Sequence, residues 1–206
     1  MTRGRFITVE GVEGVGKSTQ LARLEKHLRA KAIDLIMTRE PGGSPLAEQV
    51  RSLLLTPRAD AMTPDAELLL VFAARADHLA CQIVPALDRG QWVVSDRFTD
   101  TSFAYQGAGR GISTARIAEL ERWVQGALRP DRVIILDLPP EEGARRAQRR
   151  AEPDRFEREQ LDFFHRARDM YLSRARADPP RYRVVDAGGS EDEVHERIIS
   201  AMADLL

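Results

Sequence analysis

The residues GVEGVGKS at positions 11–18 constrain this chain more than any other feature, because they match the pattern G-x-x-x-x-G-K-[ST]. A strand-like apolar stretch, FITV at 6–9, precedes them and an amphipathic, helix-like segment follows. In that context the glycines allow a tight loop whose backbone N–H groups point at phosphate oxygens, and the N-terminus of the following helix favours the same negative charge. The sequence therefore predicts a site for the phosphates of a nucleoside triphosphate.

The positions of this loop have predicted roles toward the nucleotide. Lys17 is expected to reach the β- and γ-phosphates, and the hydroxyl of Ser18 to bind a Mg²⁺ ion. The predicted ATP site comprises the whole loop and the first residues of the helix, namely Gly11, Val12, Glu13, Gly14, Val15, Gly16, Lys17, Ser18 and Thr19.

Strand-like and helix-like segments alternate along the 206 residues, a length that suits one domain. Strands are predicted near 5–10, 34–38, 92–95, 133–138 and 182–186, and helices near 17–31, 45–55, 64–87, 113–127, 141–150, 157–177 and 191–205. The run at 133–138 is apolar without alternation, which is typical of parallel strands covered on both faces. We expect a single α/β domain with a doubly wound, five-stranded parallel sheet.

Composition argues against several classes of partner. Lys and Arg number 31 against 32 Asp and Glu, and a net charge of −1 gives no general affinity for nucleic acid or a membrane surface. The longest apolar run, 68–74, is far shorter than the roughly 20 residues that span a bilayer, and no export signal is recognised. The single cysteine, Cys81, is expected to be buried as a small apolar residue. A cytoplasmic protein is predicted.

The four histidines, His27, His78, His165 and His195, are scattered among predicted helices without the spacing of metal ligands. We expect them to be structural or surface residues rather than members of a zinc site.

Charged residues follow the predicted strands, at the sheet edge where such folds bind ligands. The second strand runs into Arg39 and the third into Asp96 and Arg97. Because the guanidinium fork matches phosphate geometry, Arg39 and Arg97 suggest a second, phosphorylated substrate. Asp96 is expected to orient Mg²⁺ directly or through water, with a plain ion pair to Arg97 as the alternative. For Arg39 the alternative is a surface arginine fixed by Glu40.

Further motifs give the chain a resemblance to the bacterial-type thymidylate kinases, which transfer the γ-phosphoryl group of ATP to dTMP. The strings that carry it span nearly the whole chain: FITVEGVEGVGKSTQ at 6–20, TREPGG at 38–43, LLLVFAARADH at 68–78, SDRF at 95–98, AYQG at 104–107 and DRFE at 154–157. The resemblance implies a P-loop kinase that forms dTDP and ADP for dTTP synthesis, uses Mg²⁺ and assembles as a homodimer. Helices 64–87 and 113–127 could supply the dimer interface, although core packing explains the same apolar periodicity.

The resemblance also assigns residues to the acceptor base. It implies that Phe72 stacks on thymine and that Arg75 donates a hydrogen bond to its O4, which favours a keto oxygen over the amino group of cytosine. Ser102 and Gln106 are further implied polar contacts. Without the resemblance, Phe72 and Arg75 would be read as a core phenylalanine beside a surface arginine.

The sugar and the phosphates have implied partners as well. Tyr105 is expected against the 2′ carbon of the sugar, where it would disfavour ribonucleotides. Arg97 would bridge the acceptor and donor phosphates, Arg39 would hold the dTMP phosphate, and Glu10 would lie near the sugar and the metal. The acceptor phosphate is already anionic, so the transfer needs alignment and charge neutralisation but no general base.

An arginine-rich stretch at about 143–158 is predicted to form a mobile lid that excludes water. Gly14 occupies a loop position where eukaryotic-type enzymes of the family carry an arginine, so the lid is expected to supply that charge through Arg149 or Arg150. Gln148 departs from the commonest lid pattern and leaves open which arginine acts. The alternative is a solvated helical face whose arginines pair with Glu141, Glu142 and Glu152.

Other functions are compatible with a phosphate-binding loop. A regulatory GTPase normally carries an Asn-Lys-x-Asp motif, but this chain contains no asparagine. A kinase for another acceptor, such as dUMP, dCMP or a nucleoside, would keep the loop and the lid and change the base pocket. A nucleotide-binding module without catalysis would bind ATP tightly and turn it over slowly or not at all.

Overall fold

Five parallel strands form one sheet in the computed structural model, which describes residues 3–57, 60–147, 155–156 and 159–206. The strands are β1 (Phe6–Glu10), β2 (Leu35–Arg39), β3 (Trp92–Asp96), β4 (Arg132–Asp137) and β5 (Tyr182–Asp186), in the spatial order β2-β3-β1-β4-β5. Every neighbouring pair runs parallel. The predicted five-stranded parallel sheet is confirmed, and the carboxyl ends of β1, β3 and β4 meet at one edge.

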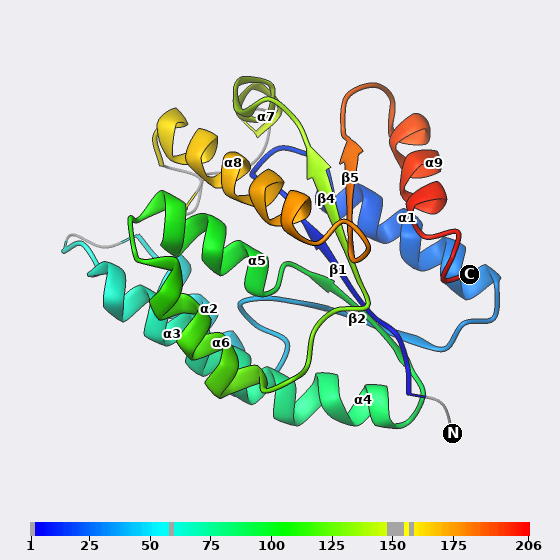
Figure 1. Cartoon of the computed structure of the whole chain (residues 1–206), viewed down its shortest axis with the longest axis horizontal. Helices are drawn as coiled ribbons and strands as arrows, with labels where there is room; N and C mark the ends of the chain where they lie inside the picture. Colours follow the sequence, from blue (N-terminus) through cyan, green and yellow to red (C-terminus); the bar gives the residue numbers. More distant parts are fainter. Residues whose placement is uncertain (1–2, 58–59, 148–154, 157–158) are drawn as a thin grey trace.

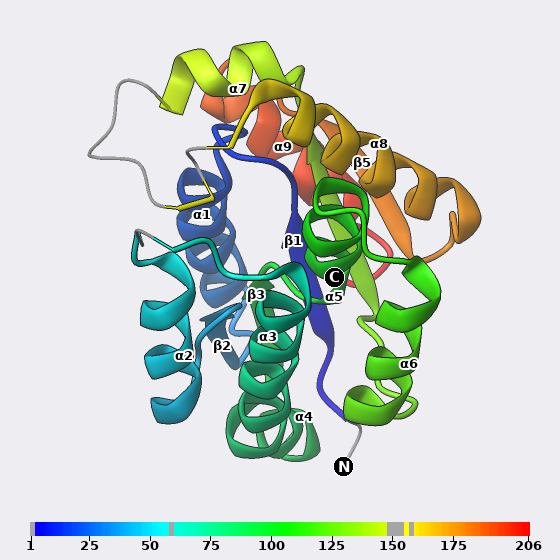
Figure 2. The same cartoon turned by 90° about the vertical axis from the view of Figure 1, so that its left-hand side faces the viewer.

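Helices cover both faces of this sheet, as a doubly wound fold requires (Figures 1 and 2). Helices α1 (Lys17–Ala30) and α9 (Glu191–Ala201) pack together on one face, while α4 (Val84–Asp88) and α8 (Leu161–Ala177) contact the strands from the other. The remaining helices are α2 (Pro45–Leu55), α3 (Pro64–His78), α5 (Thr99–Ser102), α6 (Thr114–Gln125) and α7 (Pro140–Ala147).

The central strand β1 and its neighbour β4 are mostly apolar, and both of their faces are covered. All five residues of β1 are buried, as are the first five of β4. Burial of each large aliphatic side chain, such as Ile7 or Ile134, contributes about 1.5–3 kcal/mol to folding. Polar and apolar residues do not alternate in these strands because both faces of the sheet are covered by helices.

Two π-helical turns adjoin α-helices in the described chain, and neither was predicted. One, η1 (Leu79–Ile83), joins α3 to α4, and the other, η2 (Phe103–Gly109), extends α5. π-helical turns recur at functional sites. The η2 turn lies against α8, where a side chain at Gly109 would come within 2.3 Å of the Phe163 ring. A helical course over 99–109 thus depends on packing with α8.

The continuous helical stretch Pro64–Asp88 is apolar and long enough to cross a membrane by length and composition. It instead packs against α2 and α6 and buries Glu67, Arg75 and His78, all with hydrogen-bond partners. Buried and partnered polar groups of this kind are typical of a core helix. Cys81 on the same stretch is exposed, so the prediction of its burial is wrong. The π-helical turn there breaks the 3.6-residue period on which that prediction depended.

Candidate active site

The phosphate loop connects β1 to α1, as predicted. Gly11, Gly14 and Gly16 adopt positive φ angles of 140°, 75° and 89°, which side-chain-bearing residues rarely adopt. At its end Lys17 is buried and donates from Nζ to the carbonyl oxygens of Gly11 at 3.0 Å and Val12 at 3.3 Å. Burial, and then Arg97, lowers the pKa of Lys17. The ammonium group is therefore held at the loop, where phosphate oxygens can take over its hydrogen bonds.

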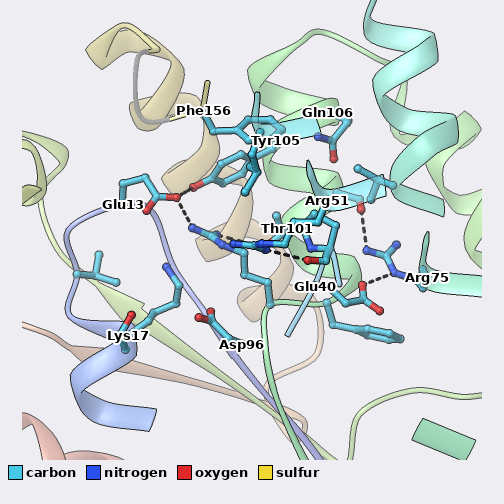
Figure 3. A pocket seen from close by; sticks show the side chains of 18 of the residues that line it. Glu13, Lys17, Glu40, Arg51, Arg75, Asp96, Thr101, Tyr105, Gln106 and Phe156 are labelled. Atoms are coloured by element: carbon cyan, nitrogen blue, oxygen red, sulfur yellow. Dashed lines mark hydrogen bonds and ion pairs between the residues drawn. The ribbon is translucent and has the colours of Figure 1, made fainter. Parts of the chain in front are cut away.

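One cavity extends from this loop across the carboxyl ends of the strands (Figure 3). Lys17 and Asp96 lie at one end, and Arg75 and Gln106 at the other. The cavity brings together most of the residues predicted for the nucleotide and acceptor sites: Glu13, Gly14, Val15, Gly16, Lys17, Ser18, Arg75, Asp96, Arg97, Ser102, Tyr105 and Gln106.

Arg97 lies between the two ends and is fixed from several directions. Its φ of 69° is strained for a non-glycine residue, and such strain is concentrated at functional sites. The guanidinium donates to the Gly11 carbonyl at 2.9 Å and to the Glu13 carboxylate at 2.5 Å. Burial opposes its charge, but Tyr105 and Glu13 outweigh that effect, so the pKa of Arg97 lies well above its ordinary value. It presents a permanent positive charge next to the phosphate loop.

Tyr105 forms part of the cavity wall beside Arg97. Its hydroxyl donates to the Glu13 carboxylate at 3.2 Å, and the Arg97 guanidinium lies 4.9 Å from the ring centre. Burial raises the pKa of the phenol well above its ordinary value, so the hydroxyl stays protonated. The ring is fixed edge-on between Phe156 and Phe163. A rigid aromatic wall at this position suits the predicted contact with a sugar.

Arg75 is buried, yet it lines the opposite end of the cavity. Its Nε donates to Glu40 at 2.7 Å and its Nη2 to Ser102 at 3.0 Å, whereas the buried Nη1 has no hydrogen-bond partner. A buried donor without a partner is costly and calls for a ligand. Phe72 lies 4.6 Å from the guanidinium and is not among the residues that line the cavity. Its stacking on a base stays a prediction.

Glu10 does not line the cavity. Its carboxyl group is fully buried and accepts hydrogen bonds from the Phe98 N–H at 2.7 Å and the Thr101 hydroxyl at 2.6 Å. Burial, and then the charge of Asp100, raises the pKa of Glu10 to about 8. The Glu10 carboxyl group is therefore protonated at neutral pH, and its hydrogen bonds stabilise the connection between β3 and α5. In this position the carboxyl group does not face a sugar or a metal in the cavity.

Asp96 and Ser18 are the predicted metal-binding residues that do line the cavity. The Oδ1 atom of Asp96 is buried and has no hydrogen-bond partner, while Arg97 pairs with Glu13. Within the described residues no three His, Cys, Asp or Glu side chains form a cluster for a metal. Mg²⁺ commonly takes only one or two protein oxygens together with substrate phosphates, so a carboxylate and a hydroxyl beside the phosphate loop fit it.

Two arginines near this edge, Arg39 and Arg51, differ in whether they line the cavity. Arg39 is half exposed, pairs with Glu48 at 2.9 Å and does not line the cavity. The partner expected for it, Glu40, pairs with Arg75 instead. Arg51 of α2 was not predicted, yet it lines the cavity and donates to the Pro41 carbonyl at 2.8 Å. Arg51 belongs to no motif, and only the packing of α2 beside the loop after β2 brings it here.

Phe156 is a second lining residue that sequence reasoning did not single out. The residue before it, Arg155, donates to the Leu54 carbonyl at 2.7 Å and to the buried Glu67 carboxylate at 2.6 Å. Glu67 also accepts from Nε2 of Gln106 at 2.8 Å. One buried carboxylate thus links a cavity amide to the segment that carries Phe156. The candidate lid residues Arg149 and Arg150 lie outside the described residues.

Comparison with known proteins agrees with this geometry. Residues 9–198 match the family model described as thymidylate kinase. The chain is 55% identical to a thymidylate kinase of Alkalilimnicola ehrlichii, covering 100% of this chain and 95% of that protein, and 54% identical to one of Pseudomonas fluorescens Pf-5, covering 98% and 97%. A crystal structure of thymidylate kinase from Ehrlichia chaffeensis is 32% identical, with a TM-score of 0.78, and covers 97% of this chain and 99% of that one. The chain belongs to the thymidylate kinase family.

Proposed function

We propose that this chain transfers the γ-phosphoryl group of ATP to dTMP, giving ADP and dTDP for dTTP synthesis. The observation that carries the proposal is one cavity with Lys17 of the phosphate loop at one end and the unpartnered Nη1 of Arg75 at the other. A triphosphate at the loop and a pyrimidine nucleotide toward Arg75 would bring their phosphates together at Arg97. Membership of the family makes the chain a nucleoside monophosphate kinase.

The reaction itself asks for alignment and charge neutralisation. An oxygen of the dTMP phosphate forms a bond to the γ-phosphorus, while the bond from that phosphorus to the β–γ bridging oxygen breaks and leaves ADP. Lys17 and Arg97 neutralise charge on the transferred group, together with the backbone N–H groups of the loop. Ser18 and Asp96 would hold Mg²⁺, which neutralises charge on the triphosphate when bound.

The acceptor end explains the choice of substrate. Nη1 of Arg75 can donate to the keto O4 of thymine but not to the amino group of cytosine. Ser102 and Gln106 supply further polar groups on the same wall, and Tyr105 offers a rigid ring for the sugar. We assign the dTMP phosphate to Arg97 and Arg51, because Arg51 lines the cavity and Arg39 does not. Arg149 or Arg150 would add charge from the lid.

We also propose that the protein acts as a homodimer in the cytoplasm. Large apolar side chains are exposed on adjacent helices, with Leu69 of α3 57% exposed and Trp123 of α6 83% exposed. Exposed groups of this size on neighbouring helices suit a self-complementary interface. Light scattering on the purified chain and on Trp123→Glu tests this: a dimer that the substitution dissociates supports the proposal, and a wild-type monomer contradicts it.

The first test of function is a coupled ADP-release assay with ATP, Mg²⁺ and, in turn, dTMP, dUMP, dCMP, UMP, thymidine or no acceptor. Strong preference for dTMP is the expected result. Preference for another acceptor would keep the kinase and refute the reading of Arg75 and Tyr105. ADP release without any acceptor would indicate a nucleoside triphosphatase, and tight ATP binding without turnover a binding module.

A further inference from the structure

The orientation of Arg75 depends on Glu40 and Ser102, which line the cavity with it, and on His78, which lies behind Glu40 and does not line the cavity. Two of its nitrogens already donate, Nε to Glu40 and Nη2 to Ser102, whereas the buried Nη1 has no hydrogen-bond partner. Because the guanidinium is a rigid plane, the atom that holds Nε sets the direction of Nη1. Glu40 is therefore the residue whose placement decides where the third donor points.

Glu40 is in turn held by His78. Its Oε2 accepts from Arg75, and its Oε1 lies 3.1 Å from Nδ1 of His78. An ionised carboxylate only accepts hydrogen bonds, so Nδ1 carries the proton and donates. Arg75 and His78 are three residues apart on α3, which places both on the helix face that meets Glu40. All three side chains are buried, and bonds of this kind are strongest away from water.

The far side of the His78 ring is fixed as well. Nε2 lies 2.7 Å from the Thr38 hydroxyl, which lies 3.0 Å from Oε1 of Gln82. Gly43 packs closely against both groups, because a Cβ atom at this position would lie 2.2 Å from Nε2 of His78 and 2.6 Å from Oγ1 of Thr38. With its φ of 90°, Gly43 lets the loop after β2 close on the imidazole. His78 is thus fixed between that loop and Glu40.

We infer that His78 is a positioning residue for base recognition, which holds Glu40 and so aims Nη1 of Arg75 at the C4 substituent of the acceptor pyrimidine. The inference rests on the proposed function, in which Arg75 reads the base. The two ring nitrogens of His78 have different roles in this inference. Nδ1 holds Glu40 in the position that orients Arg75, while Nε2 holds the imidazole ring next to the Thr38 hydroxyl. Substitutions that retain one nitrogen and not the other distinguish these roles.

The experiment compares His78→Asn, His78→Gln and His78→Leu with wild type. An asparagine amide can overlay Nδ1 and still donate to Glu40, whereas a glutamine amide overlays Nε2 and leaves Glu40 without that donor. Dissociation constants for dTMP, dUMP and dCMP are measured by calorimetry, and KM and kcat by the coupled assay. dUMP shares O4 with dTMP and lacks only the methyl group, so it shows whether a loss concerns O4 or the methyl group. dCMP lacks O4 and serves as the internal control for damage unrelated to Arg75.

Loss of one hydrogen bond to a charged group predicts that His78→Gln and His78→Leu weaken dTMP and dUMP about tenfold each and leave dCMP nearly unchanged. KM for dTMP rises in the same two variants, KM for ATP and kcat stay within about threefold, and His78→Asn keeps wild-type preference within about threefold. The Asn and Gln variants are both polar and of similar size, so their comparison holds even where His78→Leu does not fold.

Three results would overturn the inference: equal losses for dTMP, dUMP and dCMP, indistinguishable Asn and Gln variants, or a fall in kcat alone. Arg75→Lys separates this failure from failure of the proposed function, because it keeps a cation beside Glu40 and removes the guanidinium donors. If Arg75→Lys loses the preference for dTMP over dCMP while His78→Gln retains it, only the inference about His78 fails. If both variants retain it, Arg75 does not read the base.

Discussion

Replacing Glu10 with glutamine removes a buried carboxyl group whose pKa is raised from 4.5 to about 8, by burial first and by the charge of Asp100 second. Between these two pH values the folded protein keeps a proton that the unfolded chain has lost. Stability contributed by Glu10 is therefore complete below pH 4.5 and is lost as the pH rises through 8. At about 1.4 kcal/mol per pH unit, the loss is about 5 kcal/mol over the whole range and about 2 kcal/mol between pH 6 and pH 8, where the folded protein has released only half of this proton.

Urea unfolding without nucleotide, followed by tryptophan fluorescence at pH 6, 7, 8 and 9, measures this loss. The free energy of unfolding of wild type minus that of Glu10→Gln should fall by about 2 kcal/mol from pH 6 to pH 8 and then level off. Glu48→Gln is the matched control, because a backbone hydrogen bond from Gly43 lowers the pKa of Glu48 and it stays ionised throughout this range. A difference between wild type and Glu10→Gln that is constant from pH 6 to pH 9 would refute the reasoning.

Three further predictions concern turnover. Arg97→Ala should lower kcat at least about a thousandfold with an unchanged circular dichroism spectrum, because it removes a preorganised charge from the transferred phosphoryl group; near-normal turnover would contradict its role. Arg51→Ala should raise KM for dTMP about tenfold or more, since bonds to a charged phosphate are lost, while Arg39→Ala stays within about threefold; the reverse order would return the phosphate to Arg39. Arg149→Ala and Arg150→Ala, assayed separately, should lower kcat more than dTMP affinity if either reaches the phosphates, and equal effects on both constants would argue for a surface role.

The fold could be predicted closely because its signals are local. The phosphate-loop motif fixed the first strand, loop and helix, and apolar runs of strand length identified the rest of the sheet. The helical course over 99–109 was missed for a physical reason: η2 has a π-helical period, contains Gly107 and Gly109, and is stabilised by α8, more than fifty residues away. Helix α8 begins at Leu161 rather than near 157, and α9 ends at Ala201 rather than near 205.

The site was predictable where one short segment builds it. Lys17 and Ser18 follow from the loop, and Arg97 and Tyr105 follow from the motifs after β3, all of which line the cavity. Arg51 could not be found in this way, because it belongs to a segment without a motif and reaches the cavity only through tertiary packing. Phe156 lies in the DRFE string, but nothing in that string indicates that its ring lines the cavity. The burial of Glu10 and the pairing of Arg39 with Glu48 could not be predicted either. Whether a charged side chain at a strand end faces the cavity or the protein depends on tertiary neighbours that the local sequence does not identify.

The contact between the phosphate loop and α7 explains why the loop contains no arginine of its own. A Cβ atom on Gly14 would lie 2.0 Å from the carbonyl oxygen of Gly143, and one on Gly143 would lie 2.5 Å from that of Glu13, so neither position has room for a side chain. The same backbone contact places the start of the arginine-rich stretch beside the phosphate loop. The packing that excludes a side chain from position 14 therefore also places Gly143, where the arginine-rich stretch begins, against the phosphate loop.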